Sequence, residues 1–249
     1  MTGASKVTIL KLLADVGKAC AEYQDKTLRN LKCRKVQCDE IWSFCYSKEK
    51  NVPDEHKGEL GFGDVWTFTA ICADSKLAPT WRVGKRTSET AYAFMSDLAG
   101  RMAYRIQLTT DANHAYFEAV DGAFGSEIDY GQLIKMYDSP SKFGESRYSP
   151  AKFVKTKKYR AIGNPNSKAI STSFVERQNL TMRMSIRRFT RLTNAFSKKV
   201  ENLSHAVALH FMHYNFCRIH QSLRVTPAME AGVTDHVWSI EEILALLKK

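Results

Sequence analysis

The sequence predicts an α/β fold in which a mixed sheet of five strands is covered by helices on both faces. Three strand-like segments come first, and further strands then alternate with helices, an order that is typical of such a sheet. The length of 249 residues and the hydrophobic content of 44% suffice for one domain, or one and a half, with its own core. No apolar run reaches the roughly 18 residues that cross a bilayer, and the first residues lack a signal-peptide pattern. We therefore expect a cytoplasmic protein without membrane contact.

The N-terminal 35 residues are expected to form a short helix and a linker. Apolar residues recur at helical spacing over residues 4–16, and Ser5 is the predicted N-cap. Residues 19–35 carry many charges and few apolar positions, which favours a linker.

Three strands are predicted next, as a meander. Residues 36–46 form the first strand, and a polar loop separates it from strands at 65–72 and 77–83. The turn residues Ala73 to Lys76 join the second and third strands as a hairpin, and Pro79 places the third strand near an edge of the sheet.

Helices and strands alternate in the rest of the chain. They are, in order, a helix at 88–102, a strand at 104–109, a helix at 113–123, a strand at 127–137, a long loop at 138–170, and helices at 171–192, 198–217 and 239–248. Ser88 and Ser239 are the predicted N-caps of the first and the last of these helices.

Positive charge is concentrated in one part of the chain. The net charge is +11, yet the segment from Lys135 to Lys199 alone holds 16 Lys and Arg against 3 Asp and Glu, so the remainder is slightly acidic. Such a balance indicates a polyanionic partner, usually nucleic acid and less often an anionic membrane surface. The six cysteines include no C-x-x-C pair, which argues against a zinc ribbon and favours reduced thiols.

A carboxylate lies where an apolar strand should not carry one. The first strand reads VQCDEIWSF and holds Asp39 in its middle, although moving an ionised carboxylate out of water costs several kcal/mol unless a metal or a partner compensates. Asp111 follows the fourth predicted strand, so the two carboxylates meet if those strands are neighbours. Glu40 points to the opposite face from Asp39, toward solvent or a neighbouring basic residue.

A third carboxylate, Glu176, lies on the arginine-rich helix predicted at 171–192. Positions seven and eleven residues later return to nearly the same helical face, which places Arg183 and Arg187 with it, and Asn179 lies close beside them. Three facing carboxylates stay ionised together only when divalent cations neutralise them, and oxygen ligands suit Mg²⁺ or Mn²⁺. Two ions about 3.5–4 Å apart would support an in-line phosphoryl displacement. In the alternative reading, the aspartates are solvated turn residues and Glu176 pairs with an arginine on a surface helix.

Four segments together resemble a bacterial insertion-sequence transposase of the DDE type. They are CDEIWSF, TTDANHAYFEAV, STSFVERQNLTMRMSIRR and HYNFCRIHQSLRVTPAMEAG. The resemblance extends over residues 36–235, and its most specific parts are Glu176 to Asn179 and Tyr214 to Pro227.

This resemblance implies an RNase H-like catalytic domain at 36–235 with Asp39, Asp111 and Glu176 as catalytic and metal-binding residues. It implies two Mg²⁺ or Mn²⁺ ions, cleavage of DNA at transposon ends, strand transfer to target DNA, and a homo-oligomer in the synaptic complex. Residues 1–35 are then the remnant of a longer DNA-binding region, and 236–249 a C-terminal helix. The basic residues expected to contact DNA, with one asparagine, are Arg177, Asn179, Arg183, Arg187, Arg188, Arg191 and Lys198. Arg218 and His220 contact phosphate or serve a structural surface role.

Two other functions remain open from the sequence. A shortened or repurposed transposase would bind DNA through the basic segment without catalysing transposition. An RNase H-like nuclease would act on other substrates. The sequence leaves open the terminal repeats, the target preference and the oligomeric state.

Overall fold

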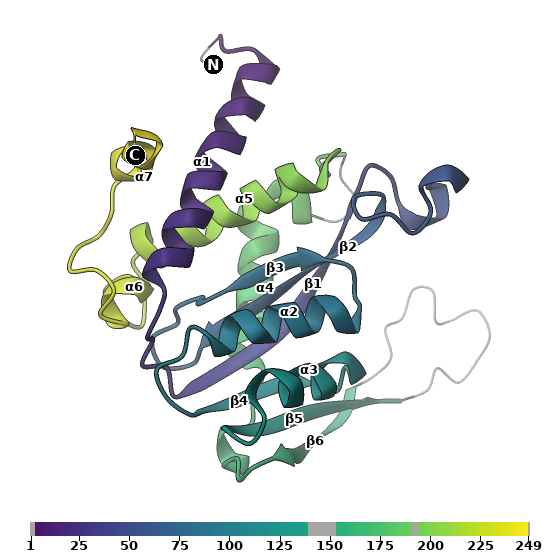
Figure 1. The fold of residues 1–249 in the computed structure, drawn as a ribbon, viewed down its shortest axis with the longest axis vertical. Helices are drawn as coiled ribbons and strands as arrows, with labels where there is room; N and C mark the ends of the chain where they lie inside the picture. The colour runs from purple at the N-terminus through teal and green to yellow at the C-terminus, as the bar shows by residue number, and fades with distance from the viewer. Residues whose placement is uncertain (1–2, 139–152, 191–193, 249) are drawn as a thin grey trace.

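A mixed six-stranded sheet forms the centre of the described part of the molecule, in the order β3-β2-β1-β4-β5-β6. The computed structural model describes residues 3–138, 153–190 and 194–248 (Figure 1). The strands are β1 (Lys35–Cys45), β2 (Gly63–Cys72), β3 (Trp81–Gly84), β4 (Ile106–Asp111), β5 (Ile128–Tyr137) and β6 (Phe153–Ile162). β1 pairs antiparallel with β2 and parallel with β4. The antiparallel strands β1–β3 and the later strands, which alternate with helices, are therefore joined at β1.

Helices cover both faces of the sheet, as predicted. On one face, α2 (Ser88–Ala99) and α3 (His114–Phe124) pack against a core that includes Phe68 and Tyr130 (in front of the sheet in Figure 1). On the other face, α4 (Ser173–Ser185) and α5 (Val200–Met212) bury Ile41 and Ile71. The remaining helices are α1 (Lys6–Thr27), α6 (Pro227–Glu230) and α7 (Ile240–Ala245), with one π-helical turn at His213–Cys217 and short 3₁₀ turns at Glu49–Asn51, Asp54–His56, Ser167–Ala169, Arg187–Phe189 and Leu246–Lys248.

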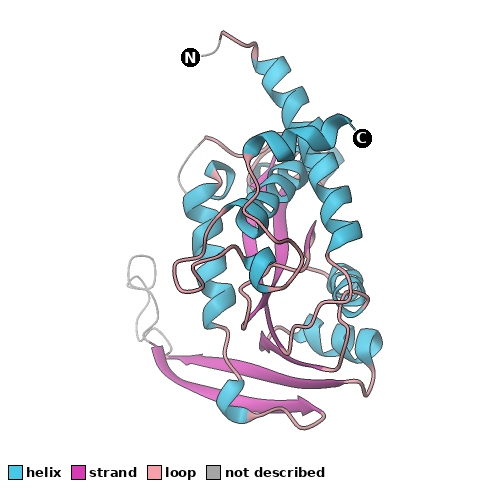
Figure 2. Ribbon diagram, turned by 90° about the vertical axis from the view of Figure 1, so that its left-hand side faces the viewer, coloured by secondary structure: helices cyan, strands magenta, loops and turns pink. Residues whose placement is uncertain are grey.

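The prediction of five strands was wrong because β6 lies inside the segment 138–170 that was predicted to be a loop. β6 runs antiparallel to β5, and the two form a long ribbon at the edge of the molecule (Figure 2). All but the last two residues of β6 are exposed, so the strand has no buried apolar face. Hydrophobic alternation marks half-buried strands, and a basic edge strand held by backbone pairing does not show it.

The predicted linker at 19–35 was also wrong, because α1 continues to Thr27. Val16, Cys20 and Leu28 are buried in the core beside Ala208 of α5. Ser5 accepts a hydrogen bond from the amide of Thr8, which confirms the predicted N-cap.

Element ends account for the other differences. The predicted helix at 88–102 begins with Thr87, rather than Ser88, as its N-cap. The helix predicted at 171–192 ends at Ser185, and Ile186 is extended before the next 3₁₀ turn. Ser239 caps α7 in a capping box with Glu242, as predicted. The strand predicted at 77–83 is confined to Trp81–Gly84, so Pro79 lies before it, and β3 is an edge strand, as predicted. Within the described ranges, no helix combines the length and hydrophobicity that crossing a bilayer requires.

Candidate functional site

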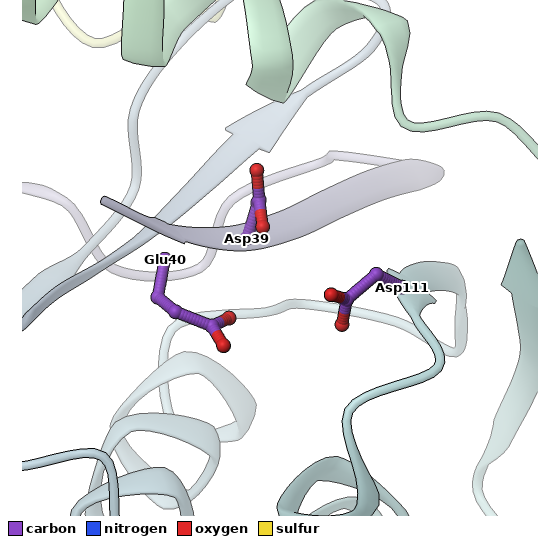
Figure 3. A group of neighbouring side chains, drawn as sticks. All are labelled: Asp39, Glu40 and Asp111. Atoms are coloured by element: carbon purple, nitrogen blue, oxygen red, sulfur yellow. The ribbon is translucent and has the colours of Figure 1, made fainter. Parts of the chain in front are cut away.

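Asp39 and Asp111 meet because β1 and β4 are parallel neighbours. The last pair in their register is Gln37 with Thr109, and each aspartate lies two residues further along its strand. The paired register ends there. Beyond it the Asp39 side chain points toward α4, whereas the Asp111 carboxylate points toward Glu40 (Figure 3). They border a cavity of about 610 Å³ whose wall also includes residues of β5, α4 and the segment after β4. The sequence predicted this meeting, and the strand order confirms its premise.

Three carboxylates lie close together at this point: Asp39, Glu40 and Asp111. Each offers one oxygen, and these oxygens lie within 4.8 Å of one another (Figure 3). Burial, followed by the charges of Glu40 and Asp111, raises the pKa of Asp39 to about 7. Burial and Glu40 also raise the pKa of Asp111, although the amide of Asn113 and the charge of Arg86 oppose this shift. The positive groups nearby therefore leave the negative charge of the two aspartates incompletely balanced.

Glu40 is on the other side of β1 and is fully engaged. Its carboxylate accepts hydrogen bonds from Arg86 Nε at 2.7 Å, Asn113 Nδ2 at 2.7 Å and Tyr116 Oη at 2.8 Å. Only 1% of the side chain is exposed. Of the two predicted surroundings, the basic neighbour is confirmed in Arg86, while exposure to solvent is wrong.

Glu176 lies in the first turn of α4 and borders the same cavity as the aspartates. It accepts a hydrogen bond from Lys135 Nζ at 2.6 Å and another from the Thr172 hydroxyl. Its charge contributes to the raised pKa of Asp39. It is nevertheless absent from the compact carboxylate group that the described residues form. The structure thus brings Asp39 and Asp111 together and leaves Glu176, paired with a lysine, on the α4 wall of the cavity.

Asn179 connects α4 to β1. It is 5% exposed, and its Nδ2 donates to Asp39 Oδ2 at 2.8 Å, while the Thr69 hydroxyl donates to its Oδ1 at 3.3 Å. The side-chain amide of Asn179 orients the Asp39 carboxylate and partly compensates its charge. The DNA contact predicted for Asn179 stays a prediction.

The basic residues predicted to contact DNA are in different places. Arg183 borders the carboxylate cavity, and Arg177 lies on another side of α4, next to a second cavity. The prediction that Arg187 continues the Glu176 face of one helix was wrong, because α4 ends at Ser185. Arg188 Nη1 donates to Ser197 Oγ at 2.9 Å, and Lys198 Nζ lies 4.0 Å from the centre of the Phe196 ring. Arg191 is outside the described residues.

Three polar residues of the site were not found by the sequence reasoning: Arg86, Asn113 and Lys135. Asn113 follows Asp111 by two residues, and this spacing was an available signal. Its amide nitrogen donates to Asp111 Oδ1 at 3.0 Å. Arg86 and Lys135 come from segments that only the tertiary fold brings to β1 and α4, so local pattern carried no information about them.

No family model matches the chain, and no curated protein matches it significantly. The geometry of the cavity is therefore the basis for a functional assignment.

Proposed function

We propose that the chain is a DNA transposase of the DDE type, which cleaves DNA at insertion-sequence ends and transfers the strand to target DNA in a metal-dependent reaction. The observation that carries this proposal is the meeting of Asp39 and Asp111 on parallel neighbours, in one cavity with Glu176 of α4. The sheet order is compatible with an RNase H-like fold to which β6 adds an edge strand.

The carboxylates fit Mg²⁺ or Mn²⁺. The donor atoms are all oxygens. Burial, followed by the neighbouring carboxylates, raises the pKa of Asp39, and a cation bound there would favour its charged form. Asp39 and Asp111 would hold the ions, with Glu176 as the third ligand and two ions as the expected number. When bound, such ions stabilise the attacking and leaving oxygens of a phosphoryl transfer. Asn179 keeps the Asp39 carboxylate oriented, and Arg86, Lys135 and Arg183 place positive charge around the space that a phosphodiester would enter.

Positive charge continues from the cavity along the sheet edge. Lys135 of β5 borders the cavity, and β6, which pairs with β5, carries exposed Lys155 and Lys157. Neither of these two lysines forms an ion pair with any residue that the structure describes. This arrangement supports DNA as the partner. The proposal includes a homo-oligomer that holds two transposon ends and a cytoplasmic location.

Cleavage of a duplex carrying the element's ends, with Mg²⁺ or Mn²⁺, tests the proposal. We expect nicking that disappears in Asp39→Ala and in Glu176→Ala. The matched control is Asp54→Asn, since that carboxylate is 93% exposed and does not border the cavity. Cleavage by Asp39→Ala and Glu176→Ala at the wild-type rate would show that the assigned carboxylates are not catalytic.

A second candidate function is DNA binding without cleavage. The ion pair between Lys135 and Glu176 favours it, because Glu176 is engaged away from the two aspartates. This function predicts duplex binding that is equal in wild type and Asp39→Ala, with no nicking at any Mg²⁺ or Mn²⁺ concentration.

A further inference from the structure

A second cavity lies on another side of α4 and is lined by cationic side chains. Its volume is about 530 Å³, and it is bordered by Lys76, Arg177, Arg218 and His220. Arg177 comes from α4, Lys76 from the turn after β2, and the other two from the segment after the π-helical turn. That segment belongs to the Tyr214–Pro227 run, which the carboxylate cavity leaves without a function.

No carboxylate borders this cavity among the described residues. In the same part of the chain, none of its three cationic residues forms an ion pair within 4.0 Å, and neither does His220. Asp74 contributes only a favourable charge at longer range, to Lys76. Burial, and after it the charges of Lys76 and Arg218, lowers the pKa of His220. Several like charges around one space without a counter-charge favour an anion there.

Neighbouring contacts hold two sides of the cavity, at Lys76 and at His220. Lys76 Nζ lies 3.5 Å from the centre of the Phe174 ring, and the buried Tyr214 donates its hydroxyl proton to the Lys76 carbonyl at 2.9 Å. The His220 amide donates to Val225 O at 2.9 Å, and the Arg224 amide donates to His220 O at 2.8 Å. His220 Nδ1 is also 3.1 Å from Ser222 Oγ. The parts of the wall that carry Lys76 and His220 are therefore ordered without a ligand.

The positions of residues on α4 separate the two cavities. Glu176, Asn179 and Arg183 border the carboxylate cavity, whereas Phe174, Arg177 and Thr181 border the cationic one. At about 100° per residue, these two sets occupy roughly opposite sides of the helix. A group bound in the cationic cavity would thus touch the helix that carries Glu176 without occupying the space beside Asp39.

We propose that the cationic cavity binds a phosphate group, supplied by the backbone of the DNA or by free phosphate. Two guanidinium groups and an ammonium group provide the planar and point-charge donors that phosphate oxygens accept. The choice of DNA as a source rests on the proposed function, whereas the phosphate site itself does not.

Two binding experiments on the full chain in EDTA test this site. One measures duplex DNA affinity as a function of salt, and the other measures thermal stabilisation by sodium phosphate against sodium chloride of equal ionic strength. The cavity variant is Arg177→Gln with Arg218→Gln. The matched control is Lys6→Gln with Lys11→Gln, which removes the same charge from exposed positions of α1 that border neither cavity.

If DNA supplies the phosphate, the cavity variant lowers the slope of log Kobs against log salt by nearly two units relative to the control, at about 0.9 per lost contact. If free phosphate is the ligand, phosphate stabilises the wild type and the control but not the cavity variant, and the duplex slopes agree. Equal behaviour of the cavity variant and the control in both assays would overturn the proposal. Because EDTA prevents metal-dependent cleavage, this result is independent of the nicking assay, which can fail or succeed separately.

Discussion

Neighbouring carboxylates on the two faces of β1 differ in how many hydrogen bonds they accept from side chains. On the face covered by α2 and α3, Glu40 is buried and receives hydrogen bonds from Arg86, Asn113 and Tyr116. On the face covered by α4, Asp39 receives one side-chain hydrogen bond, from Asn179, and shares a cavity with Asp111 and Glu176. Glu40 also borders that cavity, so the two carboxylates differ in how far their charge is compensated.

Under the proposed function, this difference distinguishes a structural carboxylate from a metal ligand. A carboxylate whose oxygens are already occupied by an arginine, an amide and a phenol gains little from a cation, and removing it leaves those donors unsatisfied. A carboxylate with a raised pKa gains the most from a cation. Proximity alone favours Glu40 as the third ligand of the proposed metal site. The three donors that hold Glu40 favour Glu176 instead, which is held by one partly exposed lysine and a threonine hydroxyl.

The largest expected effect is on catalysis by Glu176→Gln. We expect the nicking rate to fall at least about a hundredfold, since one stabilising group at a reacting centre is worth that much. Stability should change by less than about 1 kcal/mol, because the Lys135–Glu176 pair is partly exposed. Single-turnover cleavage and urea unfolding measure the two quantities, with the exposed Glu118→Gln of α3 as control. An unchanged rate would remove Glu176 from the catalytic group.

The second prediction is that Glu40→Gln mainly lowers stability, whereas Glu176→Gln mainly lowers the nicking rate. We expect this variant to lose about 2–3 kcal/mol of unfolding free energy, because a buried charge partner is removed from Arg86 and the neutral amide accepts weaker hydrogen bonds. Urea unfolding against the same Glu118→Gln control gives the value. If stability were unchanged while nicking was lost, Glu40 rather than Glu176 would be the ligand.

The two aspartates could be predicted because their signals are local. Asp39 interrupts an apolar strand and Asp111 follows another. That their strands are neighbours was a condition of the prediction, and the sheet order meets it. The opposite faces of Asp39 and Glu40 follow from the two-residue period of a strand. These features depend on residues adjacent in sequence or on the order of elements.

The partners of these carboxylates depend on tertiary packing and could not be predicted. Arg86 reaches Glu40 across 46 positions of sequence, and Lys135 reaches Glu176 across 41. β6 was missed for a related reason, since its exposed basic residues give no hydrophobic alternation. Backbone pairing with β5, rather than burial of side chains, makes it a strand.

The third prediction concerns pH. The pKa of Asp39 in the folded chain is raised from 3.8 to about 7, so the folded state holds a proton that the unfolded state has released. Between these two values, the metal-free protein should lose up to about 1.4 kcal/mol of stability for each unit that the pH rises. Asp39→Asn has no carboxyl group at this position, so its stability should not fall with pH for this reason. It should be more stable than the wild type at pH 8. Urea unfolding in EDTA from pH 5 to pH 8 measures it, and parallel curves for the two proteins would contradict the assigned pKa.

The smallest effect is expected for Lys135→Gln, which removes the cation paired with Glu176. Stability should change by less than about 1 kcal/mol, because the lysine and the glutamate side chains are 34% and 41% exposed. Mn²⁺ should bind a fewfold more tightly, since a positive charge leaves the cavity and Glu176 loses a competing partner. Titration calorimetry against Lys155→Gln, on the neighbouring strand β6, isolates the effect of position from that of charge. Weaker binding in Lys135→Gln than in Lys155→Gln would mean that Lys135 helps to assemble the site, and that the uncompensated charge on the α4 face does not attract the cation.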